Sequence, residues 1–220
     1  VEPELVLFNT LTDACATCKQ WELAVGWLGA VSCRGTDIDG ITAGAAIAAC
    51  QHRERWQEAL RTLSCMFQWR LEMNIVSQSA AITSCEKAGE WKASLALLGE
   101  MCLRGLQIDT PSQNAAISGC EKGSAWPFAF ELLANMRRLG LEATTISCSA
   151  AISAGVGGQQ WQKGIEVLLR MQMGGLDLNA ISCSSAASGC STAGSWQLSL
   201  SLISAMEAQY VEPDANTQMM

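Results

Sequence analysis

The sequence predicts an all-α fold built from stacked pairs of helices, and three observations support this prediction. A period of 35 residues runs through the chain, amphipathic helical patterns recur within each period, and strand patterns are absent. Because the register holds without an insertion, every repeat is expected to stack on its neighbour in the same way. Tryptophan marks the period six times: Trp21, Trp56, Trp91, Trp126, Trp161 and Trp196.

Each period contains two predicted helices, one on either side of its tryptophan. The preceding helix has a narrow face of small and apolar residues, such as Ile82 and Cys85, which lets two helix backbones approach closely. The following helix has apolar or small residues 3, 4, 7 and 10 positions after the tryptophan, which is the spacing of an amphipathic helix. One example is Ala59, Leu60, Leu63 and Met66.

Glycine and proline mark the ends of these helices. Glycine follows the second helix at Gly105, Gly140 and Gly175, where it supplies the left-handed conformation that ends a helix. The segment Asp109–Ser112, "DTPS", combines an N-cap residue with a proline in the first turn. The next first helix is therefore expected to begin just after Asp109.

Composition indicates a folded chain and limits its partners. The chain is 49% hydrophobic and 16% charged, which is enough to bury a large core, and no apolar run is long enough to span a membrane. We therefore expect no membrane contact, and no targeting segment is visible. The net charge of −7 argues against strong non-specific binding to nucleic acid.

The eleven cysteines are predicted to be core residues rather than disulfide partners. Five of them occupy the same position of different repeats, so they lie about one repeat apart and not in bonding pairs. A reducing compartment is expected. The five are Cys15, Cys50, Cys85, Cys120 and Cys190.

No catalytic, metal or cofactor site is predicted, and the chain is not expected to be an enzyme. The segments "CATC", Cys15–Cys18, and "HRE", His52–Glu54, contain the residue types of a zinc deaminase site. Their order is reversed, the proline of that signature is missing, and both segments fall inside ordinary repeats. With one histidine in the chain, there is little scope for a catalytic triad.

The repeat resembles the pentatricopeptide repeat. The segment "AAITSCEKAGEW" ends at Trp91, "AAISGCEKGSAW" ends at Trp126, and methionine and then Gly-Leu close the second helix. The resemblance implies an α-solenoid: one array over residues 5–214, followed by a tail at 215–220. Its six repeats, numbered 1 to 6 below, cover 5–39, 40–74, 75–109, 110–144, 145–179 and 180–214.

The resemblance also implies a groove, lined by the first helices, that binds single-stranded RNA with one base per repeat. Two side chains of each repeat then select the base, one near the start of the first helix and one at the last position of the repeat. The pairs, from repeat 1 to repeat 6, are Asn9 with Asp39, Gly44 with Asn74, Ser79 with Asp109, Asn114 with Thr144, Ser149 with Asn179, and Ser184 with Asp214.

Hydrogen-bond chemistry accounts for these residue types. An ionised Asp only accepts, which suits the imino N–H of guanine and uracil, whereas Asn donates, which suits adenine and cytosine. A short Ser leaves room for a purine, and Asn reaches a pyrimidine. On this basis repeats 1, 3, 4, 5 and 6 select uracil, guanine, a pyrimidine, adenine and guanine. Gly44 removes a contact from repeat 2, and Thr144 does not fix one base.

Two further sets of residues carry over from the family. An aliphatic residue three places before the first selector is expected to sandwich the base, and a lysine near the end of the first helix to contact phosphate. The sandwich residues are Val6, Ile41, Val76, Pro111, Ile146 and Ile181. At the phosphate positions, which hold Thr17, His52, Lys87, Lys122, Gly157 and Thr192, only His52, Lys87 and Lys122 can be cationic.

Each of these features has an alternative interpretation. The tryptophans are expected to pack rather than stack on bases. Residues at the ends of the repeats are also ordinary helix caps, and the sandwich aliphatics could equally belong to the core. The charge distribution separates the alternatives, because acidic groups in the groove would disfavour RNA. Four glutamates fall instead in predicted second helices: Glu58, Glu100, Glu131 and Glu166.

The predicted function is sequence-selective binding of single-stranded RNA, in the processing, editing or stability of RNA in an organelle (mitochondrion or chloroplast). The location follows from the resemblance alone. The alternative is a protein-interaction scaffold of the same fold, which the acidity and the missing lysines favour. Other proteins or further repeats of a longer array are the remaining expected partners.

Overall fold

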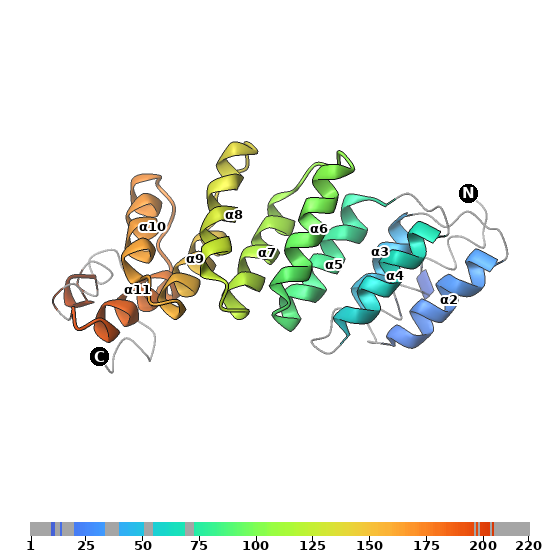
Figure 1. Cartoon of the computed structure of the whole chain (residues 1–220), viewed down its shortest axis with the longest axis horizontal. Helices are drawn as coiled ribbons and strands as arrows, with labels where there is room; N and C mark the ends of the chain where they lie inside the picture. The colour runs from blue at the N-terminus through green and yellow to red at the C-terminus, as the bar shows by residue number, and fades with distance from the viewer. Residues whose placement is uncertain are drawn as a thin grey trace. The chain divides into compact units, whose positions relative to one another are not determined.

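The computed structural model describes residues 10, 11, 14, 20–33, 40–50, 55–68, 73–195, 197, 199–202 and 204. All regular secondary structure in these segments is α-helical, and no strand occurs among them, so the predicted all-α fold is confirmed (Figure 1). The chain divides into two compact units, residues 1–115 and 116–220, which are described separately. That the six repeats form a single array stays a prediction.

In the N-terminal unit, first and second helices alternate along the chain. Helix α3 packs against α2, α4 and α5, and α5 packs against α4 and α6, so that neighbouring first helices contact each other. The helices are α2 (Trp21–Cys33), α3 (Gly40–Ala49), α4 (Trp56–Gln68), α5 (Ile75–Ala88) and α6 (Trp91–Leu103), and α7 (Thr110–Lys122) begins in this unit and ends in the next.

The C-terminal unit repeats the same arrangement. Helix α9 packs against α8, α10 and α11, and α10 packs against α11. Its complete helices are α8 (Trp126–Arg138), α9 (Thr145–Gly157), α10 (Trp161–Met173) and α11 (Ala180–Thr192).

Glycine ends the second helices in the left-handed conformation, as predicted. The φ angles of Gly105, Gly140 and Gly175 are 69°, 71° and 70°. After α6, the N–H of Leu106 donates to the carbonyl of Met101, and the N–H of Gly105 donates to that of Cys102, at 3.0 and 3.1 Å. These two bonds form a Schellman motif, which satisfies carbonyls that the helix end would otherwise leave unpaired.

In each of repeats 2 to 5, one isoleucine and one methionine are fully buried in the core. The isoleucines come from first helices and the methionines from second helices, each recurring with the 35-residue period. Burial of each such side chain contributes roughly 1.5–3 kcal/mol. The fully buried members are Ile47, Met66, Ile82, Met101, Ile117, Met136, Ile152 and Met171.

Five repeat tryptophans begin the described second helices, and Trp126 packs between successive repeats. In the C-terminal unit, the Trp126 indole lies against the backbone of Gly158, where an added Cβ would lie 2.0 Å from Cδ1 of the ring. At Gly189, an added Cβ would lie 2.8 Å from Cγ2 of Val156 and 3.0 Å from Cβ of Trp161. This close inter-repeat contact supports a packing role and explains why these two positions hold glycine.

Eight cysteines whose side chains the structure describes are free thiols, and six of these eight are buried. Burial raises the pKa of the Cys85 thiol to about 12, with a further rise from the Glu90 carboxylate. Burial likewise raises the pKa of Cys50 and of Cys120 to about 11. At neutral pH these thiols are protonated and behave as small hydrophobic residues, as predicted.

The segments Cys15–Cys18 and His52–Glu54 lie outside the described residues. Among the residues that are described, no group of His, Cys, Asp or Glu could hold a metal ion. No helix in the same segments is long and apolar enough to cross a membrane.

Candidate nucleic-acid interface

The second selector of each described repeat lies immediately before a first helix and caps it. A side-chain oxygen of the selector accepts a hydrogen bond from the backbone N–H of the serine three residues later. That N–H lies in the first turn of the helix and has no acceptor within the helix. The distances are 2.8 Å for Asn74–Ser77, 3.0 Å for Asp109–Ser112, 3.2 Å for Thr144–Ser147 and 2.8 Å for Asn179–Ser182.

Two of the serines at these third positions, Ser77 and Ser147, complete the caps with their hydroxyls, and they were not predicted as site residues. The Ser77 hydroxyl accepts from the backbone N–H of Asn74 at 3.3 Å, and the Ser147 hydroxyl accepts from that of Thr144 at 2.8 Å. Both pairs are therefore reciprocal capping boxes, with serine in the place usually held by Glu or Gln. The signal was visible in the sequence, since Ser follows each of these caps by three residues.

Capping holds each selector side chain in one conformation and occupies one of its polar atoms. In Asn74 and Asn179, Oδ1 holds the helix and the amide nitrogen is the remaining hydrogen-bonding group. In Asp109, Oδ1 holds the helix and Oδ2 remains as an acceptor. The same cap therefore presents a donor in one repeat and an acceptor in another, which is the distinction that base selection requires.

The serine first selectors direct their hydroxyl protons into their own helices. Ser79, Ser149 and Ser184 each donate to the carbonyl of the residue three places earlier, at 3.1, 3.0 and 3.2 Å. Their oxygens can still accept a hydrogen bond. Ser79 and Ser184 are half-buried, as is Asn114, whereas Ser149 is 8% exposed.

Gly44 departs from the pattern because the next repeat occupies the space beside it. A Cβ at Gly44 would lie 3.1 Å from Cγ1 of Val76, which is tighter than an ordinary contact. Val76 is the sandwich residue of repeat 3. The contact therefore brings the first-selector position of one repeat next to the sandwich residue of the following repeat.

The described sandwich aliphatics are on the surface, so the alternative that they are core residues is wrong. Val76, Ile146 and Ile181 are 54%, 61% and 59% exposed, and Pro111 is also exposed. Three branched aliphatic side chains thus lie exposed one turn before a first selector, and a role in the core does not account for them.

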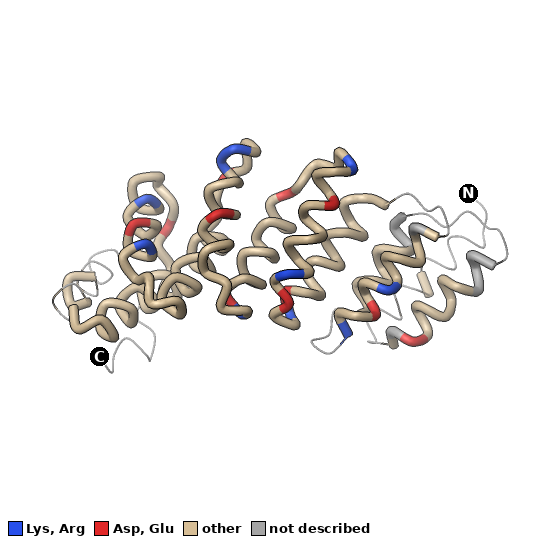
Figure 2. The backbone as a smooth tube through the Cα atoms, in the orientation of Figure 1, with Lys and Arg blue, Asp and Glu red and all other residues tan. Residues whose placement is uncertain are grey.

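The first helices that the structure describes, α3, α5, α7, α9 and α11, contribute no net charge to this surface. Helices α3, α9 and α11 contain no charged residue, as Figure 2 shows for α9 and α11. In α5 and α7 one acid and one base cancel, Glu86 with Lys87 and Glu121 with Lys122. The two lysines are the exposed cations predicted to contact phosphate. Four glutamates lie instead in the second helices, as predicted: Glu58, Glu100, Glu131 and Glu166.

The remaining predicted residues lie outside the described part of the chain. They are Val6, Asn9, Asp39, His52 and Asp214, together with the side chain of Ile41.

Comparison with known proteins identifies the repeat. A family model described as PPR repeat matches residues 79–106, which fall within repeat 3. None of the curated protein sequences is a significant match to this chain.

Solved structures share the fold. The crystal structure of the pentatricopeptide repeat protein PPR10 from maize has a TM-score of 0.71 at 18% identity, over 95% of this chain and 30% of its own. PPR10 in complex with an 18-nt psaJ RNA element has a TM-score of 0.59 at 16% identity, over 99% and 37%. This chain thus spans about a third of PPR10.

A third structure matches over nearly its whole length. The PPR domain of Arabidopsis thaliana protein-only RNase P 1 (PRORP1), in complex with tRNA, has a TM-score of 0.70 at 13% identity, over 88% of this chain and 98% of its own. These likenesses show the fold of a pentatricopeptide α-solenoid. The matched segment identifies one PPR repeat in this chain, at residues 79–106, and the unbroken 35-residue period repeats that unit along the sequence.

Proposed function

We propose that the chain binds single-stranded RNA, with one base facing each repeat. The observation that carries the proposal is the pairing of a cap-fixed polar selector with an exposed aliphatic side chain on successive first helices. The polar group can read a base edge, and the aliphatic group can cover a base face. The solved structures of PPR10 with an RNA element and of the PRORP1 domain with tRNA support this proposal.

Base preference follows from the atom that each cap leaves available. In repeat 3, Oδ2 of Asp109 accepts from the imino and amino groups of guanine, with Ser79 beside it. In repeat 5, the amide nitrogen of Asn179 donates to N1 of adenine, with Ser149 beside it. Asn114 and Thr144 of repeat 4 favour a pyrimidine. Repeat 2 has no side chain at Gly44 and selects weakly.

The first experiment is fluorescence anisotropy with a randomised pool of short single-stranded RNA at low salt, followed by sequencing of the bound fraction. The expected result is saturable binding with guanine and adenine enriched two positions apart, facing repeats 3 and 5. A matched double-stranded RNA is the control and should bind less, because its base edges are paired. Absence of single-strand binding, or binding without base preference, would contradict the proposal.

The affinity for RNA is expected to be modest because the surface has few cations. Phosphate contacts supply much of the affinity in nucleic-acid binding, and Lys87 and Lys122 are the described lysines at the phosphate positions. On single strands each such contact contributes a slope of roughly −0.7 in log K against log salt. A shallow salt dependence is therefore expected.

A protein scaffold of the same fold is the second candidate. The specific observation in its favour is that the described first helices carry no net charge, which suits a protein surface as well as an RNA base. The randomised RNA pool separates the two, since a scaffold would bind none of it.

The biological setting is proposed from the family. We place the protein in organellar RNA processing, editing or stability, as an RNA-binding element without a catalytic step of its own. A fluorescent fusion of the full-length protein, imaged with mitochondrial and plastid markers, tests the location.

A further inference from the structure

A pocket of about 350 Å³ lies in the C-terminal unit between the second helices of repeats 4 and 5. Its floor is apolar and includes Phe130 and Leu133 of α8 and Val167 and Met171 of α10. The volume is within the range of small-molecule and side-chain pockets. Most of the lining comes from second helices, and no selector or sandwich residue lines the pocket, although Ala143 and Cys148 directly precede the selectors Thr144 and Ser149.

The rim of this pocket is basic although the chain is acidic. Arg137, Lys163 and Arg170 line it together with one acid, Glu166, which gives a net charge of +2 (three cations and one carboxylate) in a chain of −7. Glu166 pairs with Arg170 at 2.5 Å. The Lys163 ammonium lies 4.8 Å from the centre of the Trp126 ring, which holds it beside the pocket.

The charge of Arg137 affects Cys148, a buried residue that lines the pocket. Burial raises the pKa of the Cys148 thiol, and the positive charge of Arg137 opposes part of that rise. Cys148 is buried and lines the same pocket. Arg137 and Cys148 line the same pocket, so the guanidinium can meet an anionic group that enters it.

The other repeats show that these cations are not part of the repeat pattern. At 35-residue steps from Arg137, Lys163 or Arg170, the other five repeats hold no lysine or arginine at any of the three positions. The three exceptions fall in the two adjacent repeats that build one pocket. Stacking does not require them, because repeats without them stack in the same way.

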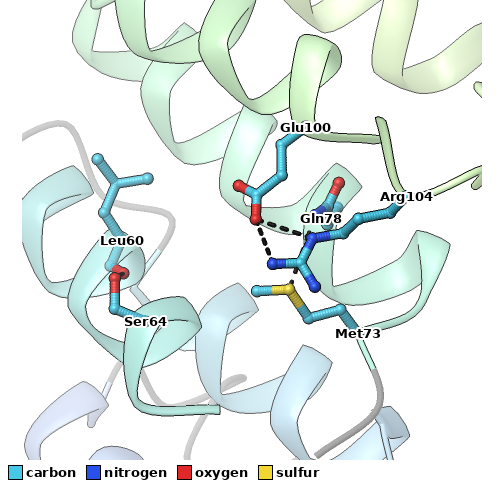
Figure 3. Close-up of polar contacts among 6 residues, drawn as sticks. All are labelled: Leu60, Ser64, Met73, Gln78, Glu100 and Arg104. Atoms are coloured by element: carbon cyan, nitrogen blue, oxygen red, sulfur yellow. Dashed lines mark hydrogen bonds and ion pairs between the residues drawn. The ribbon is translucent and has the colours of Figure 1, made fainter. Parts of the chain in front are cut away.

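The corresponding pocket of the N-terminal unit serves as an internal comparison. It measures about 390 Å³ and is lined by Leu63, Ser64 and Met73, which are equivalent to Leu133, Ala134 and Ala143. Glu100 stands there in the place of Arg170. The guanidinium of Arg104 makes two hydrogen bonds to Glu100, at 2.9 and 2.6 Å (Figure 3). That pocket therefore has no net charge (one cation and one carboxylate).

We propose that the basic pocket between α8 and α10 docks a peptide segment of a protein partner, with a bulky aliphatic or aromatic side chain on the floor and carboxylates against the rim. Charge complementarity selects an acidic segment, because the net positive rim surrounds an apolar floor. A nucleic acid fits less well, since the floor is apolar apart from the Cys148 thiol, which is only a weak hydrogen-bonding group for a base edge.

The test selects a random dodecapeptide phage library against the full chain, with counter-selection on the Ala134→Trp variant. Ala134 is exposed and lines the pocket, so an indole there fills the pocket without entering the core. The expected peptides carry Asp or Glu beside Leu, Ile or Phe. Synthesised and labelled, they should lose about tenfold or more in affinity for Ala134→Trp, and affinity should fall as salt rises.

A matched pair of charge variants tests the rim. Arg137→Gln should weaken the peptides by about three- to tenfold, whereas Arg138→Gln, the exposed neighbour that does not line the pocket, should leave affinity unchanged. Thermal melting confirms that all variants are folded. RNA binding by Arg137→Gln should equal that of the wild type, so this proposal and the RNA proposal fail independently.

Several results would overturn the docking site. These are no peptide enriched on the wild type over Ala134→Trp, enrichment of neutral or basic peptides, or equal losses for Arg137→Gln and Arg138→Gln. Binding of a 12-nucleotide RNA that Ala134→Trp abolishes would assign the pocket to nucleic acid instead. A dimer of the wild type by light scattering that Ala134→Trp abolishes would assign it to a second copy of the chain.

Discussion

Oδ1 of Asp109 accepts a hydrogen bond from the backbone N–H of Ser112 at 3.0 Å, so the residue predicted to select a base also caps helix α7. Capping and base selection had been alternative interpretations of Asp109, and the geometry makes them compatible. The cap holds one oxygen, and Oδ2 remains for a ligand. A selector fixed in this way loses little conformational entropy when it binds.

Loss of a sandwich aliphatic should weaken RNA binding without unfolding the protein. Ile146 is 61% exposed, so Ile146→Ala should change the free energy of unfolding by less than about 0.5 kcal/mol while weakening RNA binding. The buried isoleucine of the same helix is the control: Ile152→Ala should cost about 2–5 kcal/mol. Chemical denaturation and anisotropy measure the two effects. A large stability loss in Ile146→Ala would mean that the side chain supports the fold.

Alanine at Gly158 should disturb the contact between repeats 4 and 5. Its Cβ would lie 2.0 Å from Cδ1 of Trp126, so the ring has to move, and a cost of about 1–3 kcal/mol is expected. Gly157, one residue earlier, has nothing within 4 Å of an added Cβ. Gly157→Ala should therefore be neutral or stabilising by up to about 1 kcal/mol. Similar melting temperatures for the two variants would refute the packing role of Trp126.

Stability should fall at alkaline pH because of the buried thiols. The pKa of Cys85 is raised from an ordinary value of 9.0 to about 12. Because the thiol ionises at lower pH in the unfolded chain than in the folded one, its contribution to stability is intact below pH 9. That contribution is lost as the pH rises from 9 toward 12. Cys85→Ala should lose less stability than the wild type between pH 8 and pH 10.5, by a difference on the order of 1–2 kcal/mol. Parallel curves would show that Cys85 does not ionise on unfolding.

The sequence predicted the parts of the fold that depend on local pattern. Helix spacing, the terminal glycines and the buried Ile–Met series follow from a period that recurs and from residue types with strong local preferences, such as Gly105 in the left-handed conformation. The division of the chain between residues 115 and 116 was not predicted, because the period runs through it unchanged.

Features that depend on contacts between repeats were less predictable. The approach of Val76 to Gly44 follows from how two repeats stack, and composition does not reveal it. Arg137 and Lys163 lie on different helices and become neighbours only through stacking. Exposure of Ile146 also needed the structure, because a branched aliphatic in a helix is usually buried. The serine that completes a capping box, Ser77 or Ser147, could have been predicted from the sequence, because it follows its cap by three residues.

The most direct test of the central claim exchanges one selector atom. Asp109→Asn keeps the cap, since Asn and Asp are nearly equal at this position, and replaces the Oδ2 acceptor with a donor. Two RNA oligonucleotides that differ only by guanine or adenine opposite repeat 3 are measured by anisotropy against both proteins, with melting temperatures recorded. The prediction is guanine preferred by the wild type and adenine by the variant, with a change of about 1 kcal/mol and little change in melting temperature. An unchanged base preference accompanied by a lower melting temperature would contradict the account, because Asp109 would then act as a helix cap and nothing more.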